Sequence, residues 1–317
     1  MKVDLPTTLE SLRRTVLALL DRYRAFRYGR LGEPVDSRDR ISVATWPVIL
    51  GLALSLFTTL PSFEFSFVAF GSPATVPLTG TFAIAFVLSL LAASGAESVV
   101  SAHPSFATAA QRTGGRTWPF WALPMAMTII ITLSLPRLPT PLLQVLALLL
   151  SSAIFILTFF SLYLTVETGQ PGFRRARLAL NLLTYAAAVF LFLFVYQTRT
   201  RSLVSATLVA ITAMLLAIEL LRGSAPSTGT VISYGAIVGL VLGQVTWALN
   251  YWPLPALTGG LLLLLIFYVL VSVAQSGLQQ RLTGRVVVEF LVVAVLALVL
   301  LSVVGPGFSV MNPGATP

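Results

Sequence analysis

The 317-residue sequence contains no cysteine and only one histidine. The absence of cysteine excludes disulfide bonds, thiolate metal sites and thiol nucleophiles. A single histidine leaves too few ligands for the zinc sites that proteins usually build, because these sites combine several histidine and cysteine side chains. The sequence therefore predicts neither a metal site nor a bound cofactor.

The sequence also lacks the common catalytic signatures. It contains no G-x-x-x-x-G-K-[ST] phosphate loop, no H-E-x-x-H zinc motif and no G-x-S-x-G nucleophile elbow. The usual markers of nucleotide-driven transport, zinc proteolysis and α/β-hydrolase chemistry are thus missing. Serine chemistry without these markers stays open, but the sequence favours a protein that is not an enzyme.

Charged residues are scarce. They make up 10% of the chain, against 56% hydrophobic residues and a mean hydropathy of +0.91. Such a chain has many apolar runs long enough to cross the ~30 Å hydrocarbon core of a bilayer, and few charges to solvate a water-facing surface. We therefore predict an integral membrane protein whose main partner is the lipid bilayer.

The formal charge of +9 arises from 19 arginines and one lysine against 11 acidic residues. A basic balance of this size can indicate nucleic-acid binding, but these cations lie between apolar runs, where signals for membrane topology belong. Nucleic acid is therefore not an expected partner.

Apolar runs separated by clusters of proline, glycine and arginine predict nine membrane spans. Their expected ranges are 43–61, 81–103, 117–135, 142–165, 178–197, 203–221, 230–251, 255–274 and 286–304. The predicted fold class is all-α: a polytopic integral membrane helix bundle over residues 41–305, followed by a short external tail at residues 306–317.

Residues 1–40 predict a cytoplasmic segment that contains an amphipathic helix. Pro6 and the capping pattern Thr7-x-x-Glu10 mark its start, and apolar residues then recur at three- and four-residue steps opposite several arginines. This segment has no apolar h-region of a signal peptide, so we expect the first span to direct insertion. The helix is expected to lie on the membrane surface with its cations near anionic lipid headgroups; docking to a soluble partner is the alternative.

The distribution of cations predicts the orientation in the membrane. Alternate loops divide into one side with 17 Lys and Arg residues and another side with only Arg137, Arg199 and Arg201. Because Lys and Arg accumulate on the cytoplasmic side, the N-terminus is expected in the cytoplasm and, with an odd number of spans, the C-terminus outside. The expected location is the plasma (inner) membrane. A re-entrant pair at spans five and six would change the later orientation.

A stripe of small residues marks the seventh predicted span. Gly235, Gly239 and Gly243 recur at four-residue spacing, and Thr246 and Asn250 continue the same helical face. At about 100° per residue these five positions fall within a stripe roughly 80° wide. Glycines at this spacing allow two helix backbones to approach closely, which is a main way for helices to associate in lipid. We predict a packing seam here; glycines scattered by composition are the alternative.

Three acidic residues lie inside predicted spans, namely Glu97, Glu219 and Glu289. A charge in the bilayer is unfavourable unless it is paired or hydrated, so each is a candidate functional residue. Arg222 follows Glu219 by three residues and Arg285 precedes Glu289 by four, so both acids have a cation available on their own helix.

Glu97 differs from the other two acids because it follows a run of small residues and has Ser94, Ser98 and Ser101 within helical reach. His103 lies at the cytoplasmic end of the same span. One hypothesis is a shallow polar cavity on the cytoplasmic side that binds a cation, a proton or a lipid headgroup. The alternative is ion pairing and snorkelling of these side chains at helix ends.

The predicted external segment between the first two spans contains Phe63, Phe65 and Phe67, which alternate with polar residues. An alternation with period two indicates an extended strand. We expect this strand to lie on the outer membrane interface, and a lid over a substrate path is the alternative.

The closing part of the chain carries a resemblance to known proteins. The runs Trp247-Ala-Leu-Asn-Tyr-Trp-Pro-Leu-Pro255 and Thr258-Gly-Gly-Leu-Leu-Leu-Leu-Leu265, with Glu289-Phe290 in the last span, resemble a C-terminal module of uncharacterised bacterial multi-spanning membrane proteins. The resemblance covers at most the last ~75 residues. It implies a membrane fold, and it carries over neither an activity nor site residues because the function of those proteins is unknown.

Features that pack helices together outnumber features that suggest chemistry. The leading functional prediction is therefore a non-enzymatic scaffold or accessory subunit of a membrane complex, which binds another membrane protein or a second copy of itself. The alternative is a transporter or flippase for a lipidic or weakly polar substrate that uses the Glu97 region and the glycine-lined helix. A membrane-embedded transferase is the third hypothesis.

Overall fold

The computed structural model describes residues 37–58, 61, 63–69, 72–103, 117–167, 169, 171–198, 202–224, 227–251, 254–280 and 283–304. The predicted N-terminal amphipathic helix, the C-terminal tail and the Arg199 and Arg201 positions lie outside these residues. Predictions about them therefore stay predictions.

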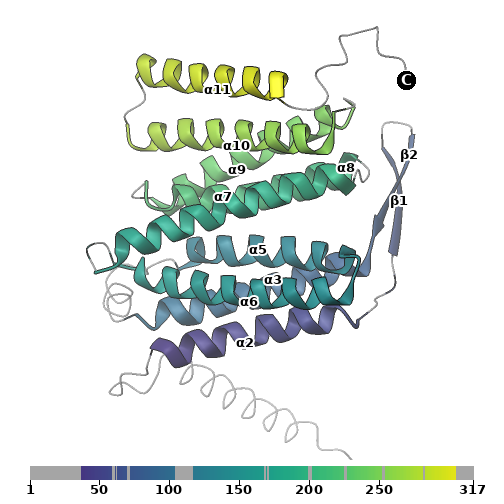
Figure 1. The fold of residues 1–317 in the computed structure, drawn as a ribbon, viewed down its shortest axis with the longest axis vertical. Coiled ribbons are helices and arrows are strands. Elements are labelled where there is room, and N and C mark those ends of the chain that lie inside the picture. Colours follow the sequence, from purple (N-terminus) through teal and green to yellow (C-terminus); the bar gives the residue numbers. More distant parts are fainter. Residues whose placement is uncertain are drawn as a thin grey trace, which may run out of the picture.

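The described residues form nine α-helices that run back and forth through one bundle (Figure 1). They are α2 (Ser37–Ser55), α3 (Gly80–Ser101), α5 (Ala122–Ser134), α6 (Pro141–Leu164), α7 (Phe173–Thr198), α8 (Ser202–Leu221), α9 (Thr228–Leu249), α10 (Ala256–Leu278) and α11 (Gly284–Val304). Short 3-10 turns extend α5 at both ends, η1 (Trp118–Trp121) before it and η2 (Leu135–Arg137) after it.

Seven helical segments among the described residues are long and apolar enough to cross a membrane: α3, α5 with its two 3-10 turns, α6, α7, α8, α9 and α10. The protein is therefore a membrane-embedded helical protein. Helices α2 and α11 match the first and ninth predicted spans but are not among these seven, so the count of nine spans stays a prediction. Three charged residues in the first turn of α2, Arg38, Asp39 and Arg40, lower its apolar character.

When the 3-10 turns are counted with α5, the observed helices begin and end within a few residues of the predicted spans, with two larger differences. Helix α2 begins at Ser37 and ends at Ser55, six residues before each expected boundary, so that Pro47 lies inside the helix. Helix α7 begins at Phe173, five residues before the expected start of its span. The helix therefore includes Arg177, which the sequence analysis counted among loop cations.

Helical structure satisfies the backbone in lipid, and many buried hydroxyl groups are satisfied in the same way. The hydroxyls of Thr45, Thr128, Thr184 and Thr246 each donate to the carbonyl oxygen four residues earlier, at 2.6–2.8 Å. These bonds stay within one helix, which lets a polar side chain face the apolar core without a partner on another helix.

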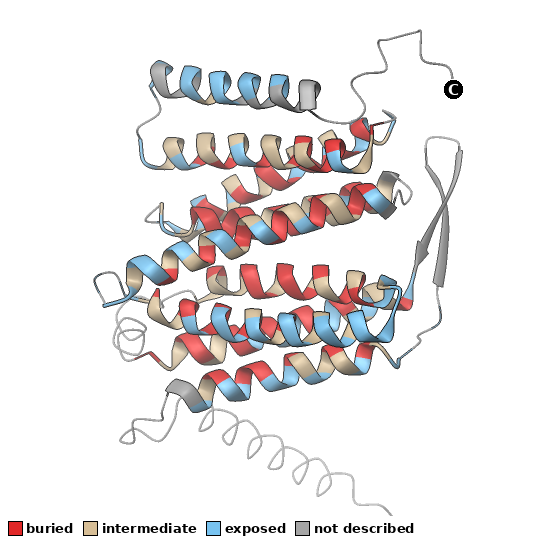
Figure 2. Ribbon diagram, viewed as in Figure 1, coloured by how far each residue is buried: buried red, intermediate tan, exposed pale blue. Residues whose placement is uncertain are grey.

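Helices α5 and α8 occupy the centre of the bundle, with 61% and 56% of their spanning residues buried, against 33% for α6 and α7. Figure 2 shows buried residues along α5, and many exposed residues on α6 and on the described part of α11. The most extensive helix pair is α8 with α9, and α11 packs mainly against α10.

A β-hairpin connects α2 to α3 and lies at one end of the helices, called here the hairpin end (Figure 1). Strand β1 (Phe63–Ala69) coincides with the predicted extended segment and pairs antiparallel with β2 (Ser72–Leu78). The sequence analysis did not predict β2, because Pro73 and Pro77 disfavour a strand. In a two-stranded ribbon both strands are edges, and prolines four residues apart can both direct the missing N–H outward.

Candidate functional site

Glu219 is completely buried near the end of α8, on the side of the bundle opposite the hairpin end. Its Oε1 accepts a hydrogen bond from Nη2 of Arg222 at 2.9 Å, just after the end of the same helix, and one from Nη1 of Arg177 at 3.4 Å, on α7. Removing a carboxylate from water is unfavourable unless opposite charges and hydrogen bonds compensate. Two guanidinium groups provide that compensation here.

Arg177 also binds the backbone of α8. Its Nη2 donates to the carbonyl oxygens of Glu219 at 3.2 Å and Leu220 at 2.9 Å. Carbonyl groups in the last turn of a helix have no partner within the helix and carry the negative end of its dipole. Arg177 therefore satisfies the end of α8 and fastens it to α7.

Arg222 extends the same group of contacts to two further elements. Its Nη2 donates to Oγ1 of Thr165, just after α6, at 3.2 Å, and its Cζ lies 3.9 Å from the ring centre of Phe120 in η1. The face of an aromatic ring attracts a guanidinium group. We call Glu219, Arg177, Arg222, Thr165 and Phe120 the charge cluster; it joins α6, α7, α8 and η1.

Two atoms of the charge cluster are buried without a hydrogen-bond partner among the described residues, Oε2 of Glu219 and Nε of Arg222. A third such atom, Oδ1 of Asn181, lies one turn after Arg177 on α7. Buried polar atoms normally have partners, because an unmade hydrogen bond is unfavourable by about 1–3 kcal/mol. Each of these atoms can form at least one further hydrogen bond.

Glu97 is half-buried and accepts a hydrogen bond from Nε1 of Trp121 at 2.9 Å. The sequence analysis placed three serines within helical reach of Glu97. Of these, Ser98 and Ser101 donate to carbonyls of their own helix, and Ser94 is exposed. Because Trp121 follows Phe120 in η1, this short turn lies between Glu97 on α3 and the charge cluster.

His103 is buried after the end of α3, and its ring lies 4.9 Å from that of Tyr163 in an edge-on contact. Tyr163 precedes Thr165 of the charge cluster by two residues. The structure therefore places Glu97, His103 and Glu219 at one end of the bundle, where their contact residues Trp121 and Tyr163 lie close in sequence to Phe120 and Thr165 of the charge cluster. Glu289 is not part of this group, because it lies exposed on the peripheral helix α11.

The sequence analysis missed Arg177, Trp121 and the aromatic contact of Phe120. One signal was available for Arg177: it shares a helical face with Asn181 and Thr184, which would have indicated a buried polar face rather than a loop. Thr184 is indeed completely buried.

The glycine stripe of α9 lies against α8. Gly235, Gly239 and Gly243 are all buried, and a Cβ atom added to Gly239 would meet the carbonyl oxygen of Ala210 and lie 2.7 Å from Cβ of Met214. The matching residues of α8 recur at four-residue steps and are Ala206, Ala210, Met214 and Ile218. We call this contact the α8–α9 seam.

The two polar residues of the stripe serve the seam differently. Thr246 is completely buried and donates to the carbonyl oxygen of Leu242 at 2.8 Å, within α9. Nδ2 of Asn250 donates to Oγ of Ser205 on α8 at 2.7 Å. Leu240, on the other side of α9, is 59% exposed. The stripe and the exposed face of α9 are thus clearly separated.

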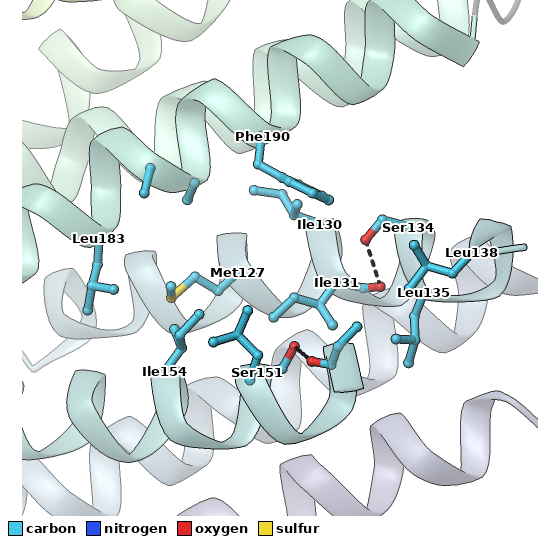
Figure 3. A pocket seen from close by; sticks show the side chains of 14 residues that line it. Met127, Ile130, Ile131, Ser134, Leu135, Leu138, Ser151, Ile154, Leu183 and Phe190 are labelled. Atoms are coloured by element: carbon cyan, nitrogen blue, oxygen red, sulfur yellow. Dashed lines mark hydrogen bonds between the residues drawn. The ribbon is translucent and has the colours of Figure 1, made fainter. Parts of the chain in front are cut away.

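An apolar pocket of about 310 Å³ lies between α5, α6 and α7 (Figure 3). Its walls are formed by Met127, Ile130, Ile131, Ser134, Leu135, Leu138, Ala147, Leu150, Ser151, Ile154, Leu183, Ala186, Ala187 and Phe190. Its two hydroxyl groups donate within their own helices, Ser134 to Ile131 at 3.2 Å and Ser151 to Ala147 at 2.7 Å. The pocket therefore offers a hydrocarbon surface.

Comparison with known families places this arrangement in context. Residues 60–304 match the model of a family described as "Protein of unknown function (DUF5656)". The chain belongs to this family. The match runs from the hairpin to the end of α11, so the charge cluster, the α8–α9 seam and the pocket of this chain all lie within the matched residues. No curated protein and no solved structure matches the chain.

Proposed function

We propose that this family member is a non-enzymatic scaffold or accessory subunit of a membrane complex, and that α11 binds a helix of the partner protein. The observation that carries this proposal is the position of α11. It packs mainly against α10 at the periphery of the bundle (Figure 1), whereas every other described helix packs against at least two others.

The described side chains of α11 present an exposed apolar surface between Val288 and Val299. The large side chains exposed there are Val288, Leu291, Val292, Val293, Val295, Leu296, Leu298 and Val299. Most of them recur at three- and four-residue steps, which is the spacing at which one helix packs against another. A partner helix would bury this surface.

Glu289 adds a polar feature to the same helix. It is exposed, and it lies about 8 Å along the axis from the start of α11 at ~1.5 Å per residue. An acidic side chain at this depth is unfavourable in lipid and suits a partner that offers a cation, a hydroxyl or an amide. The charge cluster supports a structural role for the buried acid Glu219, because its charges join helices of this chain to one another.

We further propose that α2 and α11 cross the membrane as first and ninth spans, in the plasma membrane, with the end opposite the hairpin on the cytoplasmic side. In this orientation the N-terminal segment lies in the cytoplasm, where its amphipathic helix contacts anionic lipid headgroups, and the C-terminal tail lies outside. The support is the excess of Lys and Arg in the loops on that side.

Cysteine labelling tests the orientation cleanly, because the chain has no cysteine of its own. Gln197 lies in the last turn of α7 at the hairpin end, Ser227 precedes α9 at the other end, and both are exposed. In intact cells a membrane-impermeant maleimide should label the Gln197→Cys protein and not the Ser227→Cys protein. Both should react once the membrane is opened. Labelling of Ser227→Cys in intact cells would reverse the proposed orientation.

Photo-crosslinking in native membranes tests the role of α11. A photoreactive residue at Leu296 should form an adduct with one defined protein, and the same residue at Leu149, exposed on α6, should not. In a second step, the Glu289→Leu substitution should weaken binding of that purified protein several-fold. Adducts with lipid only, or with a second copy of this chain only, would contradict the accessory-subunit proposal.

The apolar pocket specifically favours a second candidate, a transporter or flippase for a lipidic substrate. A transported lipid must leave the bilayer surface and pass between helices, and a hydrocarbon-lined cavity between α5, α6 and α7 is suited to its chain. Movement of a fluorescent phospholipid between leaflets of vesicles that contain the purified protein would favour this function over the scaffold.

A further inference from the structure

We propose that the pocket between α5, α6 and α7 binds one hydrocarbon chain of an anionic phospholipid, and that Arg137 binds the phosphate of the same molecule. This site is separate from α11 and from the charge cluster. The proposal does not depend on the scaffold function, because a subunit without transport activity can also hold a structural lipid.

The size and chemistry of the pocket indicate a hydrocarbon chain. Three small lining side chains on α6 and α7, Ala147, Ala186 and Ala187, leave space between the helices. Its volume of about 310 Å³ is roughly twice that of a ~150 Å³ apolar cavity that takes up benzene, and it falls at the lower end of the usual range for ligand pockets. A chain segment fits such a space better than a headgroup does, because the two hydroxyls in its wall are bonded within their helices.

The rim of the pocket is open to the surrounding lipid. Among the lining residues Leu150 is 63% exposed and Phe190 49% exposed, and Ala186 is also exposed. A lipid chain can therefore enter sideways from the bilayer without passing through water.

A cationic side chain, that of Arg137, lies at the hairpin end of the pocket. Arg137 lies between the lining residues Leu135 and Leu138, is exposed, and has its Cζ 4.8 Å from the ring centre of Phe194. Phe194 in turn stacks on the lining residue Phe190, with ring centres 6.4 Å apart. The guanidinium group is thereby held beside the pocket instead of extending freely.

The spacing between cation and pocket matches the geometry of a phospholipid. From Met127, at the deep end of the pocket, to Arg137 the chain rises by about 15 Å, which is half of a ~30 Å hydrocarbon core. A guanidinium group binds phosphate oxygens in a planar, two-bond arrangement. A lipid with its phosphate at Arg137 would thus direct its chain along α5 through one leaflet. In the proposed orientation this is the outer leaflet, where Arg137 is one of few cations.

Photo-crosslinking tests the pocket. The full-length protein is placed in nanodiscs of equal amounts of phosphatidylethanolamine and phosphatidylglycerol, with a small amount of phosphatidylglycerol that carries a photoreactive group in its chain. Adducts should concentrate on the lining residues of α5, α6 and α7. The Ala186→Phe variant fills the pocket from an exposed position and should lose most of these adducts. The matched control Ala153→Phe, exposed on α6 outside the pocket, should keep them.

Native mass spectrometry of retained lipids tests the proposed contact between Arg137 and the lipid phosphate. The wild-type protein should retain phosphatidylglycerol in preference to phosphatidylethanolamine, and Arg137→Gln should reduce this preference roughly tenfold, as expected for loss of a charge-assisted hydrogen bond. Arg174→Gln, an exposed arginine at the opposite end of α7, should not change it. Undiminished adducts in Ala186→Phe would overturn the pocket, and an unchanged lipid preference in Arg137→Gln would overturn the phosphate contact.

Discussion

Replacing Gly239 with isoleucine should destabilise the bundle by about 1–3 kcal/mol, which is typical of overpacking in a tightly packed core. A side chain at this position has no room, because the nearest atoms are the carbonyl oxygen of Ala210 and, at 2.7 and 3.1 Å, Cβ and Cα of Met214. All of them belong to or adjoin the backbone of α8, so α8 and α9 must move apart. The melting temperature in mild detergent should fall clearly.

The three glycines should differ in the size of the effect when each is replaced with alanine. At Gly235 the closest atom is Cγ1 of Ile218, at 2.6 Å, on a side chain that can change its rotamer. At Gly243 the closest atoms are Cβ of Ala210 at 2.9 Å and the carbonyl oxygen of Ala206 at 3.1 Å, neither of which can rotate away. We therefore expect the loss of stability to decrease in the order Gly239, Gly243, Gly235.

The control for this series is Leu240→Ile on the exposed face of α9, which should melt near the wild-type temperature. Helix propensity acts against the expected effect, because removing glycine from a helix interior stabilises by up to about 1 kcal/mol. The sign of the change is therefore informative. Glycine replacements that leave the melting temperature unchanged or raise it would show that the α8–α9 contact does not hold the bundle together.

Sequence periodicity was sufficient to predict features that lie within one helix. The lengths of apolar runs indicated most helices, the four-residue spacing identified Gly235, Gly239 and Gly243, and the three-residue spacing paired Glu219 with Arg222. Each of these depends on residues close in sequence, whose relative positions are determined by the helix itself. The partner helix of the stripe, α8, was not identified, because spacing within α9 says nothing about its neighbour.

Contacts between distant segments could not be predicted from the sequence. Arg177 and Glu219 are 42 residues apart, and Trp121 and Glu97 are 24 apart. It was reasonable to expect the serines near Glu97 to form a polar site with it. Serine hydroxyls in helices, however, can bond instead to carbonyls of the preceding turn. The pocket could not be predicted from the sequence either, because it depends on alanines of α6 and α7 that line the same space only after the helices pack.

Replacing Glu219 with glutamine should give the other large effect, a loss of roughly 3–5 kcal/mol, as for other buried ion pairs from which one partner is removed. The substitution keeps the shape of the side chain but leaves the largely buried Arg177 and Arg222 side chains, 19% and 9% exposed, without an opposite charge. Thermal unfolding in detergent measures the change. The matched control is Glu289→Gln, which removes an acidic charge from an exposed position on α11 and should leave the melting temperature close to that of the wild type.

A variant without any of the three charges distinguishes the source of this effect. If uncompensated charge is responsible, the combined variant Arg177→Met, Glu219→Leu and Arg222→Met should recover much of the stability lost in Glu219→Gln, because apolar residues of similar volume can replace a buried ion pair. Recovery should be incomplete, since Arg177 also satisfies the carbonyl oxygens of Glu219 and Leu220 at the end of α8. A Glu219→Gln protein as stable as the wild type would instead mean that water reaches the charge cluster. The shallow polar cavity, rather than a structural ion pair, would then be the better interpretation of Glu219.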